Sequence, residues 1–409
     1  MTRKPVVLPP LQALQSIERP LTAPEYYHAC IGHHPRTLIP PRDVVSVLEG
    51  ELAPGSVIDW QAALNQVVAV NPGCHLRLVG KRQHARWLSD GQPPRIRFVE
   101  DCDWDGRSDM GSEFIFATPL SLEEGRTCEL IIAGRDKLKI IFRATHAVMD
   151  GMGVVHFLME LFRAIRGEPL LGSNATYTDV DLMRHVPSES LPFKKITPPP
   201  LTGGAQGDAR GGTWRRITLP GPQPHLLPRV ALAIAKYARR QGGTAAPARI
   251  AMPVSLKRHA PELLATTNFT NMLYLDIAPH EGLENVKAHL SDLLARNIDT
   301  NYPGIIEAIR YLPFTWLDRL LSITDKNYTK PKIFETAVLS VMGPFKRTAF
   351  SGGGFRAETL YGLPQKENAF VVVVGFQGKF EVLVGMANVF ASDGRLDAFL
   401  DDLQQRLCR

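Results

Sequence analysis

The chain has 409 residues, a net charge of +6, and 44% hydrophobic against 22% charged residues. This balance excludes wholesale disorder, and the length exceeds what one typical core holds, so we expect two subdomains. No apolar run approaches the roughly 18 residues that a membrane span needs. Prolines break the short apolar run at the N-terminus before it could form a signal-peptide core. We therefore expect a cytoplasmic protein without a transmembrane segment.

The cysteine and histidine patterns favour no metal. The five cysteines are an odd number and form no CxxC pair, so free thiols in a reducing compartment fit best. His28, His33 and His34 cluster near the N-terminus, but no carboxylate or cysteine at useful spacing completes a metal site. The positive charge is spread out, with no basic block that interleaves aromatics, which argues against nucleic acid. It suits an anionic ligand such as coenzyme A, an acidic carrier protein, or a plain solvated surface.

Apolar periodicity predicts the elements of the first part of the chain. A hairpin across Arg135-Asp136 ends directly before His146, and an amphipathic helix follows it. The predicted elements are helices at 43–48 and 58–68, strands at 75–79, 84–88 and 96–99, hairpin strands at 128–134 and 137–144, and a helix at 154–166.

A stretch rich in proline and glycine, residues 186–212, has the composition of a linker. It separates an N-terminal subdomain (1–185) from a C-terminal subdomain (213–409). Helices and strands mix without a strict βαβ rhythm, so the expected fold class is α+β with mixed sheets. The elements expected beyond the linker are strands at 214–219, 249–254, 272–277, 336–341, 369–376 and 379–386, and helices at 226–240 and 394–407.

One short segment carries chemistry: His146-Ala-Val-Met-Asp150-Gly151. Neutral imidazole titrates near neutral pH, so a histidine at a strand end can take a proton from an attacking hydroxyl, amine or thiol. Asp150 precedes the helix and can cap it or pair with a cation, while Gly151 permits a tight turn. A structural histidine and a simple N-cap are the alternative interpretation of the same residues.

At this segment the sequence resembles the superfamily of chloramphenicol acetyltransferase, BAHD acyltransferases, wax ester synthases and nonribosomal peptide condensation domains, whose hallmark is His-x-x-x-Asp-Gly. Weaker resemblances occur in the family's order at 18–25, 68–78, 253–258, 268–271, 339–344 and 378–386. The resemblance implies two similar chloramphenicol-acetyltransferase-like subdomains with mixed sheets around a central tunnel. His146 would lie at the middle of that tunnel, with the thioester donor and the acceptor entering from opposite mouths.

The resemblance also implies roles for further residues. His146 would be the base, Gly151 would supply backbone N–H groups to an oxyanion, and Asp150 would be structural, paired with Lys257 or Arg258. Ser340 or Asn271 could also bind the oxyanion. The full set of residues expected to bind substrate is Thr145, Asn268, Thr270, Asn271, Ser340 and Gly343.

The chain also departs from the family. Thr145 stands where condensation domains usually carry a second histidine, which argues against a standard peptide condensation domain. The BAHD signature Asp-Phe-Gly-Trp-Gly is absent. Ser255 and Lys257 replace the Asp and Arg of a Pro-Val-Asp-x-Arg strand end, so the partner of Asp150 stays open.

The resulting hypothesis is an acyltransferase of bacterial natural-product or lipid biosynthesis. It would move an acyl group from coenzyme A or a carrier protein to a hydroxyl or amine by direct attack. We expect a monomer that needs no cofactor beyond the acyl thioester, a small-molecule acceptor, and an acyl or peptidyl carrier protein as a candidate partner. Two alternatives remain: a non-catalytic condensation-like protein that binds a carrier or ligand, and a thioester hydrolase.

Overall fold

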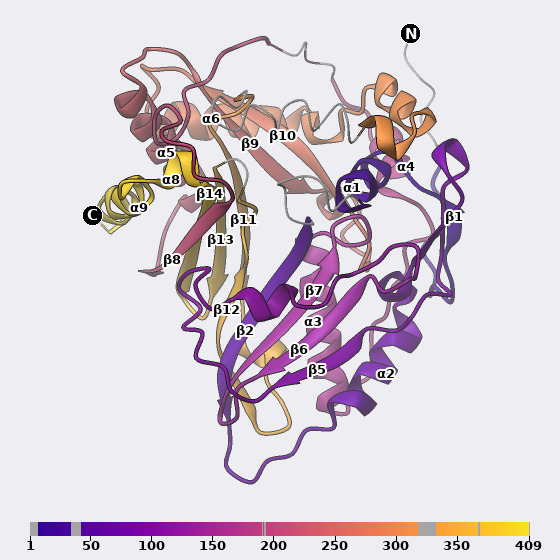
Figure 1. Ribbon diagram of the computed structural model, residues 1–409. Coiled ribbons are helices and arrows are strands. Elements are labelled where there is room, and N and C mark those ends of the chain that lie inside the picture. Colours follow the sequence, from indigo (N-terminus) through magenta and orange to yellow (C-terminus); the bar gives the residue numbers. More distant parts are fainter. Residues whose placement is uncertain are drawn as a thin grey trace.

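The computed structural model describes residues 7–33, 42–189, 191, 194–317, 333–366 and 369–408. Two large mixed sheets stand at an angle to each other, each with helices packed on it, as α+β predicts (Figure 1). Each sheet packs against a large hydrophobic cluster, and the cluster of the first sheet also includes Val372, Val374 and Leu383 from the second half of the chain. Among the described residues, no helix is both long and apolar enough to cross a membrane.

The five-stranded sheet carries His146 at the end of its central strand. Strands β6 and β7 form the expected antiparallel hairpin, and helices α2 and α3 pack together, with α3 against β2 and β7. Its strands, in sheet order, are β12 (Phe355–Gly362), β2 (Asp43–Leu52), β7 (Lys137–Thr145), β6 (Cys128–Ala133) and β5 (Arg95–Val99). The helices of this half are α1 (Ala23–His33), α2 (Trp60–Val70), α3 (Gly151–Ile165) and α4 (Asp179–His185).

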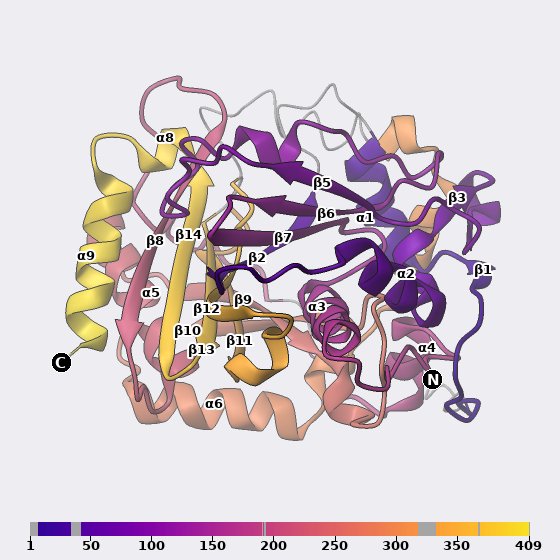
Figure 2. The same cartoon turned by 90° about the horizontal axis from the view of Figure 1, so that it is seen from below.

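The six-stranded sheet belongs to the second half of the chain. Helices α5, α6 and α9 lie along it, as the view from below shows (Figure 2). Its strands, in sheet order, are β10 (Thr270–Ile277), β9 (Ala248–Ser255), β11 (Ala337–Phe345), β13 (Phe370–Phe376), β14 (Lys379–Ala387) and β8 (Gly212–Pro220). The helices are α5 (Leu226–Gly242), α6 (Leu283–Ala295), α8 (Asn388–Ala391) and α9 (Arg395–Leu407).

Smaller elements complete the described chain. A three-stranded sheet is formed by β1 (Glu18–Pro20), β4 (Arg86–Leu88) and β3 (Arg77–Val79). The 3-10 helices are η1 (Pro72–His75), η2 (Arg82–His84), η3 (Glu113–Phe116), η4 (Leu256–His259), η5 (Ile298–Thr300), η6 (Gly304–Tyr311) and η7 (Arg347–Phe350).

Two features of the five-stranded sheet differ from the sequence-based expectation. Residues 43–48 are strand, not helix, because β2 pairs with β7 on one side and with β12 on the other. Strand β12 comes from the second half of the chain but completes the sheet of the first half. The first and second halves of the chain therefore share a sheet.

Candidate active site

His146 lies in the turn that joins β7 to α3. Strand β7 ends at Thr145, and the N–H of His146 donates to the carbonyl of Arg42, 2.9 Å away, just before β2. The N–H of Val148 donates a hydrogen bond to the carbonyl of Thr145 at 3.0 Å, which closes the turn. Backbone hydrogen bonds thus fix the point from which the imidazole projects.

Asp150 holds this turn to the second half of the chain. One carboxylate oxygen accepts the N–H of Gly153 at 2.7 Å and so caps α3. The other accepts the N–H of Phe269 at 2.7 Å and the hydroxyl of Thr270 at 2.8 Å. The side chain is 3% exposed, so these bonds form out of water, where a carboxylate needs such donors most. A structural role for Asp150 follows from these contacts.

The structure corrects the expected cationic partners of Asp150. Arg258 instead makes two hydrogen bonds to the buried Asp299, at 2.8 and 2.9 Å. The amine of Lys257 donates to the carbonyl of Ala265 at 2.9 Å. Burial lowers the pKa of Lys257, and the negative charge of Asp150 opposes that shift. Lys257 therefore acts on Asp150 only through its electrostatic field, and backbone and hydroxyl donors do the direct binding.

Asn268 forms a second clamp on the His146 turn. Its side-chain amide donates to the carbonyls of His146 and Ala147, at 3.0 and 3.1 Å. Asn268 and Thr270, two residues expected to bind substrate, therefore lie at the site but hold the turn.

The remaining sequence-predicted residues lie on other elements. The Asn271 side-chain amide donates to the carbonyls of Asp299 and Asn301, at 2.7 and 3.2 Å. It is therefore hydrogen-bonded to η5 and the residue after it. Ser340 and Gly343 lie on β11, whose Met342 approaches α3: its sulfur would be 3.1 Å from a Cβ added at Gly151. Strand β11 thus reaches the start of α3 through Met342, a residue that the motif did not indicate.

The close approach of α3 to the second half gives a stability prediction. A Cβ added at Gly153 would clash with the carbonyl oxygen of Thr266. We expect Gly153→Ala to lower the free energy of unfolding by about 1–3 kcal/mol in denaturant titration, because this backbone contact cannot relax easily. Gly204→Ala is the matched control, since nothing lies within 4 Å of its added Cβ. Equal stability of both variants would contradict the tight contact.

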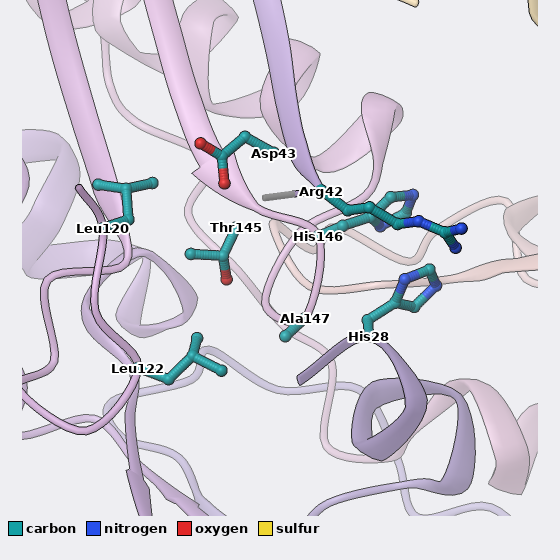
Figure 3. Close-up of a pocket in the computed structure, with 8 residues that line it drawn as sticks. All are labelled: His28, Arg42, Asp43, Leu120, Leu122, Thr145, His146 and Ala147. Atoms are coloured by element: carbon teal, nitrogen blue, oxygen red, sulfur yellow. The ribbon is translucent and has the colours of Figure 1, made fainter. Parts of the chain in front are cut away.

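A small pocket opens beside His146 (Figure 3). It encloses about 20 Å³, room for about one water molecule. Thr145 turns a buried hydroxyl toward it that has no hydrogen-bond partner among the described residues. Burial raises the pKa of Asp43 to about 7, although Arg143, 3.6 Å away, opposes the shift. The lining residues are His28, Arg42, Asp43, Leu120, Leu122, Thr145, His146 and Ala147.

Most of the residues that line the pocket could not be identified from the sequence. The sequence indicated His28 only as a member of an N-terminal histidine cluster. His34 of that cluster lies outside the described residues. Leu120 and Leu122 follow η3 in irregular chain, where no periodic pattern exists to mark a lining residue. Among the described residues, no three His, Cys, Asp or Glu side chains gather as a metal site would require.

The two histidines of the pocket are neutral at pH 7. Burial is the main cause that lowers the pKa of His146 below its ordinary 6.5, and nearby Arg42 adds to it, while Asp150 and Asn268 oppose it. Burial, His146 and Arg42 lower the pKa of His28 further. A neutral imidazole is the form that can accept a proton.

The low pKa of His28 predicts a pH-dependent stability difference. Below about pH 6.5, His28 binds a proton in the unfolded chain but stays neutral in the folded protein, where its pKa is lower. The free energy of unfolding of wild type therefore decreases as the pH falls. His28→Phe lacks this penalty. We expect the free energy of unfolding of wild type minus that of His28→Phe to fall by up to about 1.4 kcal/mol per pH unit below pH 6.5. Urea titrations from pH 8 to 5 measure it; a constant difference would contradict a buried neutral His28.

Comparisons with known proteins identify the fold. No family model matches the sequence, and no curated protein matches it. The starter condensation domain of rhizomide synthetase RzmA, solved as a double mutant with C8-CoA and Leu-SNAC, gives a TM-score of 0.66 at 14% identity, covering 96% of this chain and 94% of that one. The first condensation domain of the calcium-dependent antibiotic synthetase, bound to a substrate analogue, gives 0.66 at 17% identity, covering 97% and 96%.

A third similar structure is the condensation domain of the Monacolin K polyketide synthase MokA, with a TM-score of 0.64 at 13% identity over 97% of this chain and 98% of that one. All three likenesses span nearly the whole of both chains. They confirm the fold expected from the resemblance to the chloramphenicol-acetyltransferase-like superfamily. The tunnel through its middle stays a prediction. The chain has the two-subdomain α+β fold of the condensation domains.

Proposed function

We propose that the protein is an acyltransferase that moves an acyl group from a thioester to a hydroxyl or amine, with His146 as general base. The observation that carries the proposal is a buried, neutral histidine on the wall of a pocket, in a turn clamped by residues of both halves. The condensation-domain fold supports it, because acyl transfer is the chemistry of that superfamily. Asp150, whose oxygens are committed elsewhere, is not an acid or base in the reaction.

The proposed reaction proceeds by direct attack. His146 takes the proton of the acceptor O–H or N–H, and the freed electron pair forms a bond to the thioester carbonyl carbon. The tetrahedral oxyanion needs donors, for which the backbone N–H of Gly151 and the hydroxyl of Ser340 are the candidates left once the Asn271 amide is committed to η5. The C–S bond then breaks, and the imidazolium returns its proton to the leaving thiolate.

The pocket supports direct transfer over an acyl-enzyme. Among the described residues that line it there is no serine and no cysteine, and Thr145 supplies the only hydroxyl. Because the pocket holds about one water molecule, the reacting atoms fit beside His146, while the bulk of donor and acceptor would lie outside it or widen it. This small volume also leaves room for water as acceptor, which makes thioester hydrolysis the competing outcome of the test below.

The donor is proposed as an acyl thioester of coenzyme A or of a carrier protein. The RzmA structure holds C8-CoA, and the net charge of +6 suits either anionic partner. The similar structures come from a rhizomide synthetase, a polyketide synthase and an antibiotic synthetase, which supports a role in natural-product biosynthesis.

A thioester panel tests the proposal. Wild-type protein is incubated with acyl-CoA and acyl-carrier thioesters of several chain lengths, each with and without alcohol and amine acceptors, and products are identified by mass spectrometry. We expect an ester or amide that forms only with acceptor. Free acid at the same rate with and without acceptor would indicate a hydrolase. Saturable thioester binding without turnover in every combination would indicate a non-catalytic relative.

A further inference from the structure

A second histidine lies flat against the proposed base. The rings of His28, on α1, and His146 have centroids 4.1 Å apart and planes inclined by only 11°. The two imidazoles stack face to face beside Arg42 at one side of the pocket (Figure 3). Their Cα atoms belong to elements separated by more than a hundred residues, so the stack is a product of tertiary packing.

Helix α1 is a rigid mount for His28. In its first turn, Glu25 is 1% exposed; its carboxylate accepts the N–H of Thr22 at 2.8 Å and pairs with Arg19 at 2.7 Å. The Tyr26 hydroxyl donates to the carbonyl of Leu312 at 2.6 Å. These contacts precede His28 by less than one turn of helix, so they fix where its ring lies.

The ring of His146 lacks the usual orienting carboxylate. A histidine base is commonly held by a hydrogen bond at its second nitrogen. Here both oxygens of Asp150 are committed to other donors. The backbone of His146 and the side chain of Asn268 lie near the His146 ring and raise its pKa, but among the described residues the buried Nδ1 forms no hydrogen bond of normal geometry. The face of His28, stacked at 4.1 Å, is therefore a further contact that can set the orientation of the His146 ring, beside the Asn268 side chain and the His146 backbone.

We propose that His28 is a positioning residue for the base: its ring holds the imidazole of His146 in one orientation and faces the imidazolium that forms during proton transfer. The catalytic part of this inference rests on the proposed acyl transfer; the stack itself does not. A flat aromatic surface attracts a cation placed over it and restricts a ring stacked on it.

The charges around the pair act in opposite directions, since Arg42 disfavours an imidazolium at His146 and Asp150 favours it. Arg42 lies near both rings, Asp150 acts on His146 from the start of α3, and Asn268 holds the His146 backbone. Tyr27 packs edge-on against His28, with centroids 5.6 Å apart. Because the low pKa of His28 keeps it neutral, the pair carries one proton at most near pH 7. A neutral His28 can face the imidazolium of His146 without repulsion.

Two substitutions distinguish the effect of the flat His28 ring from the effect of its titratable nitrogens. His28→Ala removes the stack, and His28→Phe keeps a flat ring that cannot titrate. We expect His28→Ala to lower kcat about 10-fold with KM changed by less than about 2-fold, and His28→Phe to restore kcat to within about 3-fold of wild type. Unchanged kcat in His28→Ala, or a loss in His28→Phe as large as in His28→Ala, would overturn the proposal. His84→Ala, at an exposed histidine, is the control.

NMR tests whether the rings of His28 and His146 stack, and it needs no substrate. In protein with isotope-labelled histidine, the ring protons of His146 should move downfield in His28→Ala, because the shielding by the neighbouring ring is lost, and stay near their wild-type positions in His28→Phe. Unmoved signals in His28→Ala would overturn the inference whatever the kinetics show. If no thioester is turned over, the proposed function fails, but these shifts still decide whether His28 orients the ring. If His28→Ala does not fold, His28→Phe against wild type supplies the same comparison, with a large shift overturning the inference.

Discussion

Replacing His146 by glutamine is expected to lower the rate of acyl transfer by about 10²- to 10⁴-fold, the range that loss of a general base produces. Glutamine keeps a polar side chain of similar size but cannot accept the acceptor's proton at neutral pH. The turn is held by backbone carbonyls of His146 and Ala147 and by Asp150, none of which the substitution removes. The free energy of unfolding should therefore change little.

His84→Gln is the matched control, because His84 is exposed and lies in η2, away from the pocket lining. Steady-state rates and single-turnover rates on the same thioester measure the effect. If His146→Gln retained the wild-type rate while His84→Gln also did, the base would have to be another group.

The second large effect is expected for Asp150→Ala. The substitution removes the cap of α3 and leaves the buried N–H of Phe269 and the hydroxyl of Thr270 without their acceptor. It also leaves the buried amine of Lys257 without its nearby negative charge. We expect the free energy of unfolding to fall by about 3–5 kcal/mol, with transfer activity lost because the His146 turn loosens.

Asp59→Ala isolates the part of that loss that capping alone explains. Asp59 caps α2 by accepting the N–H of Ala62 at 2.8 Å, but it is exposed, and its side chain holds no other donor in the described part of the chain. Its removal should cost about 1 kcal/mol, as at an ordinary N-cap. Equal losses for the two variants in urea titrations would mean that the contacts of Asp150 to the second half contribute nothing to stability.

Local patterns in the sequence predicted much of the frame of the site. The β6–β7 hairpin, the helix after His146 and the capping role of Asp150 follow from periodicity and from the residue types at a helix start. These features depend on neighbours close in the chain. The resemblance then supplied the fold, which the periodicity alone left at α+β.

Other features depend on long-range packing that a single sequence does not display. Strand β2 was expected to begin as a helix. It is an interior strand of its sheet, so Val45, Val47 and Leu48 are all buried, and the alternation typical of a half-exposed strand is absent. The donors to Asp150 from Phe269 and Thr270 come from about 120 residues away, and nothing in the sequence marks a main-chain N–H as a partner. The positive charge of Arg258 made it a candidate partner of Asp150, but in the structure Arg258 pairs with Asp299.

The contact between His28 and His146 is of the same kind. An isolated histidine in a helix carries no sign of the ring that it will meet, and only the placement of α1 by Glu25 and Tyr26 brings the two together. The site is thus a local motif held in place by contacts from two distant segments, one before it in the chain and one after it.

The most direct measurement follows an isotope-labelled acyl group from its thioester in the presence of acceptor, with wild type and His146→Gln side by side. If His146 is the base of an acyltransferase, the label appears in an ester or amide with wild type, depends on acceptor concentration, and is formed at least about 100-fold more slowly by the variant. Transfer of the label to acceptor at equal rates by both proteins, or its release only as free acid by wild type, would contradict that assignment.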